Sequence, residues 1–70
     1  MIELSNKSII LSRLRQADGS ALIRLYNPTD EPAHTALKIH GDSFEIGFNA
    51  FEVKTFVYKN ARLSETDMIV

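Results

Sequence analysis

The stretch Ala21-Leu22-Ile23-Arg24-Leu25-Tyr26-Asn27-Pro28 decides the fold of this chain. Successive residues fall on alternate sides of it, with Ala21, Ile23 and Leu25 on one side and Leu22, Arg24 and Tyr26 on the other. An apolar side opposite a mixed side, at a period of two, is typical of a strand with one buried face. The following residues, 27–30, place Pro28 at the position that a type I turn favours. The stretch therefore predicts a half-buried strand that ends in a turn.

Further runs with the same period lie on both sides of this strand, at residues 9–14, 33–39, 44–48 and 51–58. Loops with Gly19 and Gly41 separate neighbouring runs, and Gly19 is free to adopt a positive φ. The last residues, 59–70, predict either a final strand or a fraying tail. We expect residues 1–70 to form one all-β domain, a small antiparallel β-sandwich of about five to seven short strands, either immunoglobulin-like or partial.

Residues 8–16 also allow a helix, because Ile10 and Leu14 lie four residues apart and Ser8 is a favoured N-cap residue. The β-branched pair at residues 9–10 and the period of two elsewhere in the chain favour a strand. As a strand, this segment would direct Ile9 and Leu11 to one face and Ile10, Ser12 and Leu14 to the other.

The alternation also predicts which side chains form the core. Residues 33, 35, 37 and 39 are expected to point inward, opposite the polar side that carries His34 and His40. The remaining core, or an interface with missing domains, is expected to comprise Phe44, Ile46, Phe48, Phe51 and Val53. Phe56 and Tyr58 share their side of the strand with Glu52 and Lys54, so we expect these two aromatic side chains to be exposed.

Composition excludes several classes of protein. The chain has 70 residues, no cysteine and a formal charge of −1, so it has neither disulfides nor a thiolate zinc site. A balanced charge does not predict a nucleic-acid partner, and no apolar run approaches the roughly 20 residues that span a bilayer. The first residues lack the basic and apolar regions of a signal peptide, and we expect a bacterial cytoplasmic protein without membrane partners.

Two strings carry a resemblance to a known family: the Arg-bearing segment Leu22 to Asn27, with the turn at residues 28–32, and the closing segment Phe51 to Thr55. A strand and an acidic-Gly loop, Ile9 to Gly19, run directly into the first string. In this order they resemble the C-terminal β-sandwich domain of family 38 glycoside hydrolases, the α-mannosidases. The resemblance covers most of the chain, from Ile9 to Tyr58, although Ala50 stands where the family has proline.

The resemblance implies that the chain is a non-catalytic part of a larger enzyme. The parent would be a retaining α-mannosidase that binds one zinc ion and forms a covalent mannosyl intermediate on an aspartate. The zinc ligands and the two carboxylates would lie in a separate N-terminal catalytic domain. We therefore expect no catalytic residue, no metal ligand and no cofactor in residues 1–70. The expected partners are the remaining domains of the parent, through which the chain would serve hydrolysis of a mannoside.

Arg24, Tyr26 and Asn27 are the candidate carbohydrate-binding or domain-interface residues. The guanidinium of Arg24 suits a sugar hydroxyl or a carboxylate across a domain boundary, and a structural ion pair with Glu45 or Glu52 is the favoured alternative. Tyr26 and Asn27 form a pair that can stack on and hydrogen-bond a sugar. The alternative for this pair is a half-buried aromatic ring beside a turn-forming asparagine.

The chain carries no pattern for other chemistry. His34 and His40 would lie about 20 Å apart on a straight strand, so we expect a solvated face rather than a shared metal ion. No phosphate loop, nucleophile elbow or Ser-His-Asp arrangement can be assembled from the sequence.

Two other functions remain open. A stand-alone carbohydrate-binding module would need an exposed aromatic platform, for which Tyr26, Phe56 and Tyr58 are the candidates. A dimerising module would pair exposed strand edges with a second copy, which makes a homo-oligomer the alternative partner.

Overall fold

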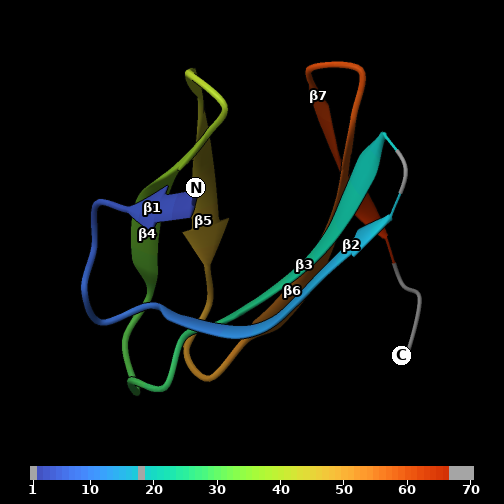
Figure 1. Ribbon diagram of the computed structural model, residues 1–70. Helices are drawn as coiled ribbons and strands as arrows, with labels where there is room; N and C mark the ends of the chain where they lie inside the picture. The colour runs from blue at the N-terminus through green and yellow to red at the C-terminus, as the bar shows by residue number, and fades with distance from the viewer. Residues whose placement is uncertain (1, 18, 67–70) are drawn as a thin grey trace.

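The computed structural model describes residues 2–17 and 19–66, which form strands and short connections without a helix (Figure 1). The strands are β1 (Ile2–Leu4), β2 (Ile10–Ala17), β3 (Ser20–Tyr26), β4 (Ala33–Ile39), β5 (Asp42–Phe48), β6 (Val53–Lys59) and β7 (Arg62–Thr66). They make a three-stranded antiparallel sheet, β1-β4-β5, and a four-stranded antiparallel sheet, β2-β3-β6-β7. The all-β sandwich is confirmed, as is a strand rather than a helix in the segment 8–16.

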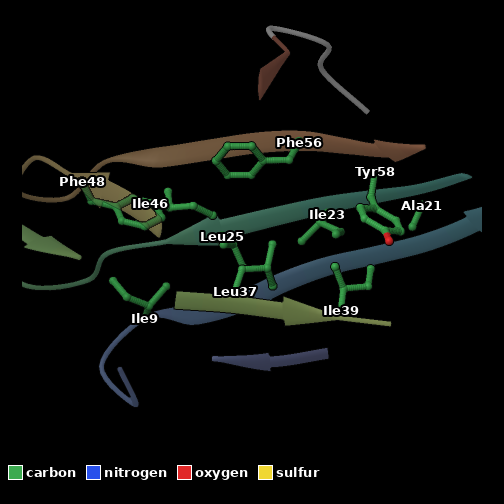
Figure 2. Close-up of a cluster of buried hydrophobic side chains, with 10 residues drawn as sticks. All are labelled: Ile9, Ala21, Ile23, Leu25, Leu37, Ile39, Ile46, Phe48, Phe56 and Tyr58. Atoms are coloured by element: carbon green, nitrogen blue, oxygen red, sulfur yellow. The ribbon is translucent and has the colours of Figure 1, made fainter. Parts of the chain in front are cut away.

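Strand β3 is central to the four-stranded sheet because it pairs with β2 on one side and β6 on the other. Its core-side residues Ile23 and Leu25 are fully buried, and Leu37 from β4 is buried against them in the facing sheet (Figure 2). The buried cluster comprises Ile9, Ala21, Ile23, Leu25, Leu37, Ile39, Ile46, Phe48, Phe56 and Tyr58. The predicted inward side of β4 and of residues 44–48 is therefore confirmed.

Two-residue turns fix the register of two hairpins. His40 and Gly41 join β4 to β5 with φ of 50° and 83°, and Asn60 and Ala61 join β6 to β7 with φ of 53° and 61°. Two consecutive positive φ values define the type I′ turn, whose twist matches that of paired strands. The third hairpin, β2–β3, turns at Gly19 with φ of 74°, as its glycine predicts.

The face predicted for Leu14 is wrong. The ladder between β2 and β3 shifts between Leu11 and Arg13, which leaves Ser12 as an extra residue whose hydroxyl donates to the Arg24 carbonyl at 3.3 Å. A bulge of this kind reverses the alternation after it. Leu14 therefore pairs with Ile23 and points to the core side, together with Leu11.

The core alternative for Phe51 and Val53 is wrong, as is the exposure expected of Phe56 and Tyr58, whereas an interface at Phe51 and Val53 stays a prediction. Phe56 and Tyr58 are 5% and 9% exposed and belong to the core, whereas Phe51 and Val53 are 58% and 52% exposed. The alternation was correct. Phe56 and Tyr58, on the side of β6 with Lys54, have a larger apolar area than the residues on the opposite side, and burial of the larger apolar area is more favourable. Phe51 lies before β6 in a turn, with φ of 57°.

The β6–β7 turn makes a testable prediction. Ala61 adopts φ of 61°, which strains an L-residue with a Cβ. We expect Ala61→Gly to raise the free energy of unfolding by about 0.5–1 kcal/mol, measured by chemical denaturation. Ala36→Gly, in the extended β4, is the matched control and should lower the free energy of unfolding by a similar amount. A lower stability for Ala61→Gly would contradict the type I′ turn.

Candidate functional site

Arg24 lies on β3 and points away from the core, because it alternates with the buried Ile23 and Leu25. Its Nε donates to Oγ1 of Thr55, the residue opposite on β6, at 3.5 Å. Of the two carboxylates considered for an ion pair, Glu45 lies on the outer side of the other sheet, since it alternates with the buried Ile46. The sheet framework therefore holds Arg24 on the outer face of β3.

The other carboxylate considered for Arg24, that of Glu52, serves a turn. Its Oε1 accepts a hydrogen bond from the backbone N–H of Asn49 at 2.7 Å. Glu52 therefore closes the β5–β6 connection.

Tyr26 shares the outer face with Arg24. It is half-buried and lies in register between Ile10 of β2 and Val53 of β6, both of which are exposed. The structure therefore brings Arg24 and Tyr26 together on one face, with apolar neighbours. Such a surface suits packing against another apolar or charged surface.

Asn27 points the other way and is fully buried. Its Nδ2 donates to the carbonyl oxygens of Glu31 at 2.8 Å and Asn49 at 3.0 Å, and its Oδ1 accepts from the N–H and hydroxyl of Thr29 at 3.1 and 2.7 Å. Its backbone N–H donates to the Glu52 carbonyl at 2.9 Å. These bonds use both amide donors and both lone pairs of Oδ1. Asn27 therefore links the β3–β4 loop to the β5–β6 connection.

The Asn27 link makes a second prediction. Asn27→Ala removes two donors from the loop carbonyls and an acceptor from Thr29, so we expect the free energy of unfolding to fall by about 1–3 kcal/mol in urea denaturation. Tyr26→Phe, on the outer face beside it, is the control and should change this free energy by less than about 0.5 kcal/mol. Equal effects of the two substitutions would show that Asn27 does not hold the loops.

The outer face of the four-stranded sheet forms a surface that we call the arginine face, defined by Arg13, Arg15, Leu22, Arg24, Tyr26 and Val57. The register directs these residues to the same side, since Arg13 opposes Arg24, Arg15 opposes Leu22, and Leu22 opposes Val57. Lys59 and Arg62 extend the same side at the β6–β7 turn. Sequence reasoning placed Leu22, Arg24 and Tyr26 on one side of the strand but did not place Arg13 and Arg15 with them, because the bulge at Ser12 determines where these two arginines point.

A second exposed surface lies on the core side of the edge strand β2. Leu11 and Leu14 point to the same side as the buried Leu25 and Ile23, yet they remain 39% and 44% exposed. The four-stranded sheet curves away from the three-stranded sheet toward the end that carries β7 (Figure 1). The sandwich is therefore incomplete along β2.

A polar cluster at one end of the core was not anticipated from the sequence. The Tyr58 hydroxyl donates to Oδ2 of Asp42 at 2.8 Å, and the Tyr58 ring lies 5.9 Å from the His40 ring and 6.0 Å from that of Phe44. The cluster borders an open hollow that Gln16, Ala17, Gly19, Ser20 and Ala21 also line. The hydrogen bond to Asp42, followed by burial and the Asp42 charge, raises the pKa of Tyr58 above 10.0.

The raised pKa of Tyr58 predicts a dependence of stability on alkaline pH. Below pH 10.0 the phenol is protonated in both folded and unfolded chains, so this contribution is complete. Above it the unfolded chain ionises first, and the contribution is lost as the pH rises through the folded pKa. We expect Tyr58→Phe, which cannot ionise, to show a shallower loss of stability at alkaline pH in thermal unfolding. Parallel pH profiles for the two proteins would contradict this assignment.

Other chemistry is not assembled in the described part of the chain. No group of three or more His, Asp or Glu side chains there could hold a metal ion, and His34 and His40 are both exposed. His40 lies in a turn rather than on a straight strand. Residues 2–17 and 19–66 contain no helix that could cross a membrane.

Comparisons with known proteins give no relative from which to transfer a function. No family model, no curated protein and no solved structure matches the chain. Two surfaces therefore define the candidate site: the arginine face and the uncovered core side of β2. Both suit packing against a further protein surface.

Proposed function

We propose that this chain is a non-catalytic β-sandwich domain that packs along β2 against a neighbouring protein domain. The observation that carries the proposal is the exposure of Leu11 and Leu14 on the core side of the sheet, at 39% and 44%. Elsewhere on that side, β3 presents Ile23 and Leu25 fully buried. Apolar residues aligned with a core yet left uncovered mark a surface that another element covers.

The neighbouring domain is, in this proposal, the catalytic part of a zinc-dependent retaining α-mannosidase. The support is the resemblance of the segments 22–27 and 51–55 to the C-terminal sandwich of family 38 glycoside hydrolases. Zinc and the catalytic carboxylates would belong to the parent, and the role of this domain would be to brace the catalytic domain.

The stand-alone carbohydrate-binding module has less support. Phe56 and Tyr58, two of the three aromatic residues considered for its platform, are buried in the core (Figure 2). Only Tyr26 of that set reaches the outer face, where it is half-buried. An aromatic platform for a sugar ring therefore does not form from the residues considered.

The proposal is tested by purifying the native polypeptide that carries this sequence and assaying it with 4-nitrophenyl α-mannoside, with and without a zinc chelator. We expect a larger polypeptide that hydrolyses the mannoside and loses activity on chelation, whereas the isolated 70-residue chain is inert. A native polypeptide without α-mannosidase activity would overturn the assignment.

A substitution on β2 tests the docking itself. We expect Leu14→Asp to lower the thermal stability of the native polypeptide clearly, by about 2 kcal/mol or more in its free energy of unfolding, because a carboxylate would be buried at the interface. In the isolated chain, where Leu14 is exposed, the change should be small. Ser43→Asp, on the exposed side of β5, is the control for an added charge. Equal effects of Leu14→Asp in both contexts would contradict docking along β2.

A further inference from the structure

Strand β5 is an edge strand with an unbroken ladder on one side and no strand on the other. All seven of its residues pair with β4, without a register shift. Among the described strands, β4 is its one neighbour. In an antiparallel sheet, every second residue of an edge strand directs its backbone N–H and carbonyl away from the sheet. The outer edge of β5 can therefore pair with a further strand.

The other three edge strands carry features that discourage such pairing. β1 has three residues. β2 contains the bulge at Ser12 and two arginines after it, and β7 has five residues, two of them charged. Short strands, bulges and charged side chains protect sheet edges. On the outer side of β5, Glu45 is the one charged residue, between Ser43 and Gly47. β5 is therefore the edge best suited to an added strand.

An open hollow of about 320 Å³ borders this edge. Gly47, which has no side chain, lines the hollow through its backbone. The apolar part of the lining comprises Phe44 of β5, Phe56 of β6 and Leu63 of β7. Phe44 and Leu63 are half-buried, so the isolated domain leaves part of their apolar surface in water. The backbone of the edge and an apolar surface therefore meet in one hollow.

The hollow lies where the three-stranded sheet lacks a fourth strand. β5 faces β6, because the Phe44 ring lies 6.0 Å from the Tyr58 ring. A second contact agrees, since Lys54 Nζ on β6 lies 5.6 Å from the centre of the Phe48 ring on β5. β7 follows β6 in the larger sheet, and its Leu63 points to the core side because it opposes the buried Tyr58. A fourth strand next to β5 would occupy the hollow, between β5 and β7.

The lining also indicates which side chains the added strand would carry. The part of the hollow between Phe44 and Leu63 is apolar. Farther along β6, Lys54 Nζ lies 4.0 Å from Oε1 of Glu65, with the two side chains 20% and 53% exposed. Alternate residues of a strand point to the same face. The added strand would therefore place apolar side chains over Phe44 and Leu63, and a polar side chain near the ion pair.

A second copy of this chain does not fit the same position. Paired strands lie about 4.8 Å apart, so two neighbouring copies of β5 would hold the two copies of β6 beneath them at a similar separation. In each copy β7 extends beyond β6 on that side. Both copies of β7 would then need the space between the two β6 strands, where there is no room for them. A single extended segment has no such conflict.

We propose that β5 accepts an extended strand from a partner protein, which becomes the fourth strand of the three-stranded sheet and fills the hollow beside β7. In strand addition, main-chain hydrogen bonds give affinity, and pockets for alternate side chains give specificity. The surface is separate from the core side of β2, where the docking of a neighbouring domain is proposed. The added strand completes the opposite side of the sandwich.

The test uses a soluble peptide of alternating valine and threonine with lysine at each end. In nuclear magnetic resonance titrations of the 70-residue chain, we expect it to shift the amide signals of β5 and β7. It should also protect the outward amides of β5 from hydrogen exchange. The matched probe is the same peptide N-methylated at every valine and threonine, which keeps the side chains but cannot donate. It should bind about tenfold more weakly or less.

A substitution in the hollow tests the side-chain part of the inference. Leu63→Lys places an ammonium group where the apolar side chains would pack, so we expect it to weaken binding of the unmodified peptide by about tenfold or more. Ser64→Lys, exposed on the other side of β7, adds the same charge and should retain nearly all of the binding. Circular dichroism checks that both variants fold, and the N-methylated peptide tests strand addition on the unchanged chain.

Several results would overturn the inference: no binding of the unmodified peptide, equal binding of the N-methylated peptide, equal weakening by the two lysine variants, or shifts confined to β1 and β2. A dimer of the free chain with protected β5 amides would also overturn it, because the occupant would then be a second copy. None of these results depends on the mannosidase assay or on Leu14→Asp, so the two proposals fail separately.

Discussion

The structure depends on the burial of one side of β3 against β4. Ile23 and Leu25 on β3 and Leu37 on β4 are fully buried, and both sheets meet at this contact. A fully buried aliphatic side chain of this size contributes about 1.5–3 kcal/mol. A chain of 70 residues without cysteine has no disulfide to supplement this contribution. The domain therefore relies on a short core whose removal would separate the sheets.

The same constraint explains why the surface proposed for docking lies at the edge of the fold. The three-stranded sheet does not cover all of the four-stranded sheet, which curves away from it toward the end that carries β7 (Figure 1). Leu11 and Leu14 remain exposed on one side of this strand, and Arg13 and Arg15 point to the other. The docking proposed for this domain therefore uses the uncovered core side of β2.

Most of the fold follows from periodicity in the sequence, whereas the site depends on details that periodicity does not contain. The alternation of residues 21–27 and 33–39 correctly predicted the buried sides of β3 and β4. The bulge at Ser12 could not be read from the sequence, because the residue itself is compatible with an unbroken strand. The reversal of Leu14 and the joint orientation of Arg13 and Arg15 therefore appeared only in the structure.

The burial of Phe56 and Tyr58 has a different cause. The charged Lys54 on the same side of β6 indicated solvent, but its Nζ lies 5.6 Å from the centre of the Phe48 ring and 4.0 Å from Glu65. A lysine can keep its charged end in water at the margin of a core. Asn27 is a polar residue whose burial was not predicted. Asparagine is common in turns, and nothing in the sequence indicated that its side-chain amide would bond two loops.

The central claim is that β2 is completed by a partner, and native-state hydrogen exchange of its amides tests this claim most directly. The measurement compares the isolated chain with the native polypeptide that carries it. The account predicts that the β2 amides exchange rapidly in the isolated chain and become strongly protected in the native polypeptide, while the β3 amides that bond to β6 are protected in both. Equal protection of β2 in the two samples would contradict it.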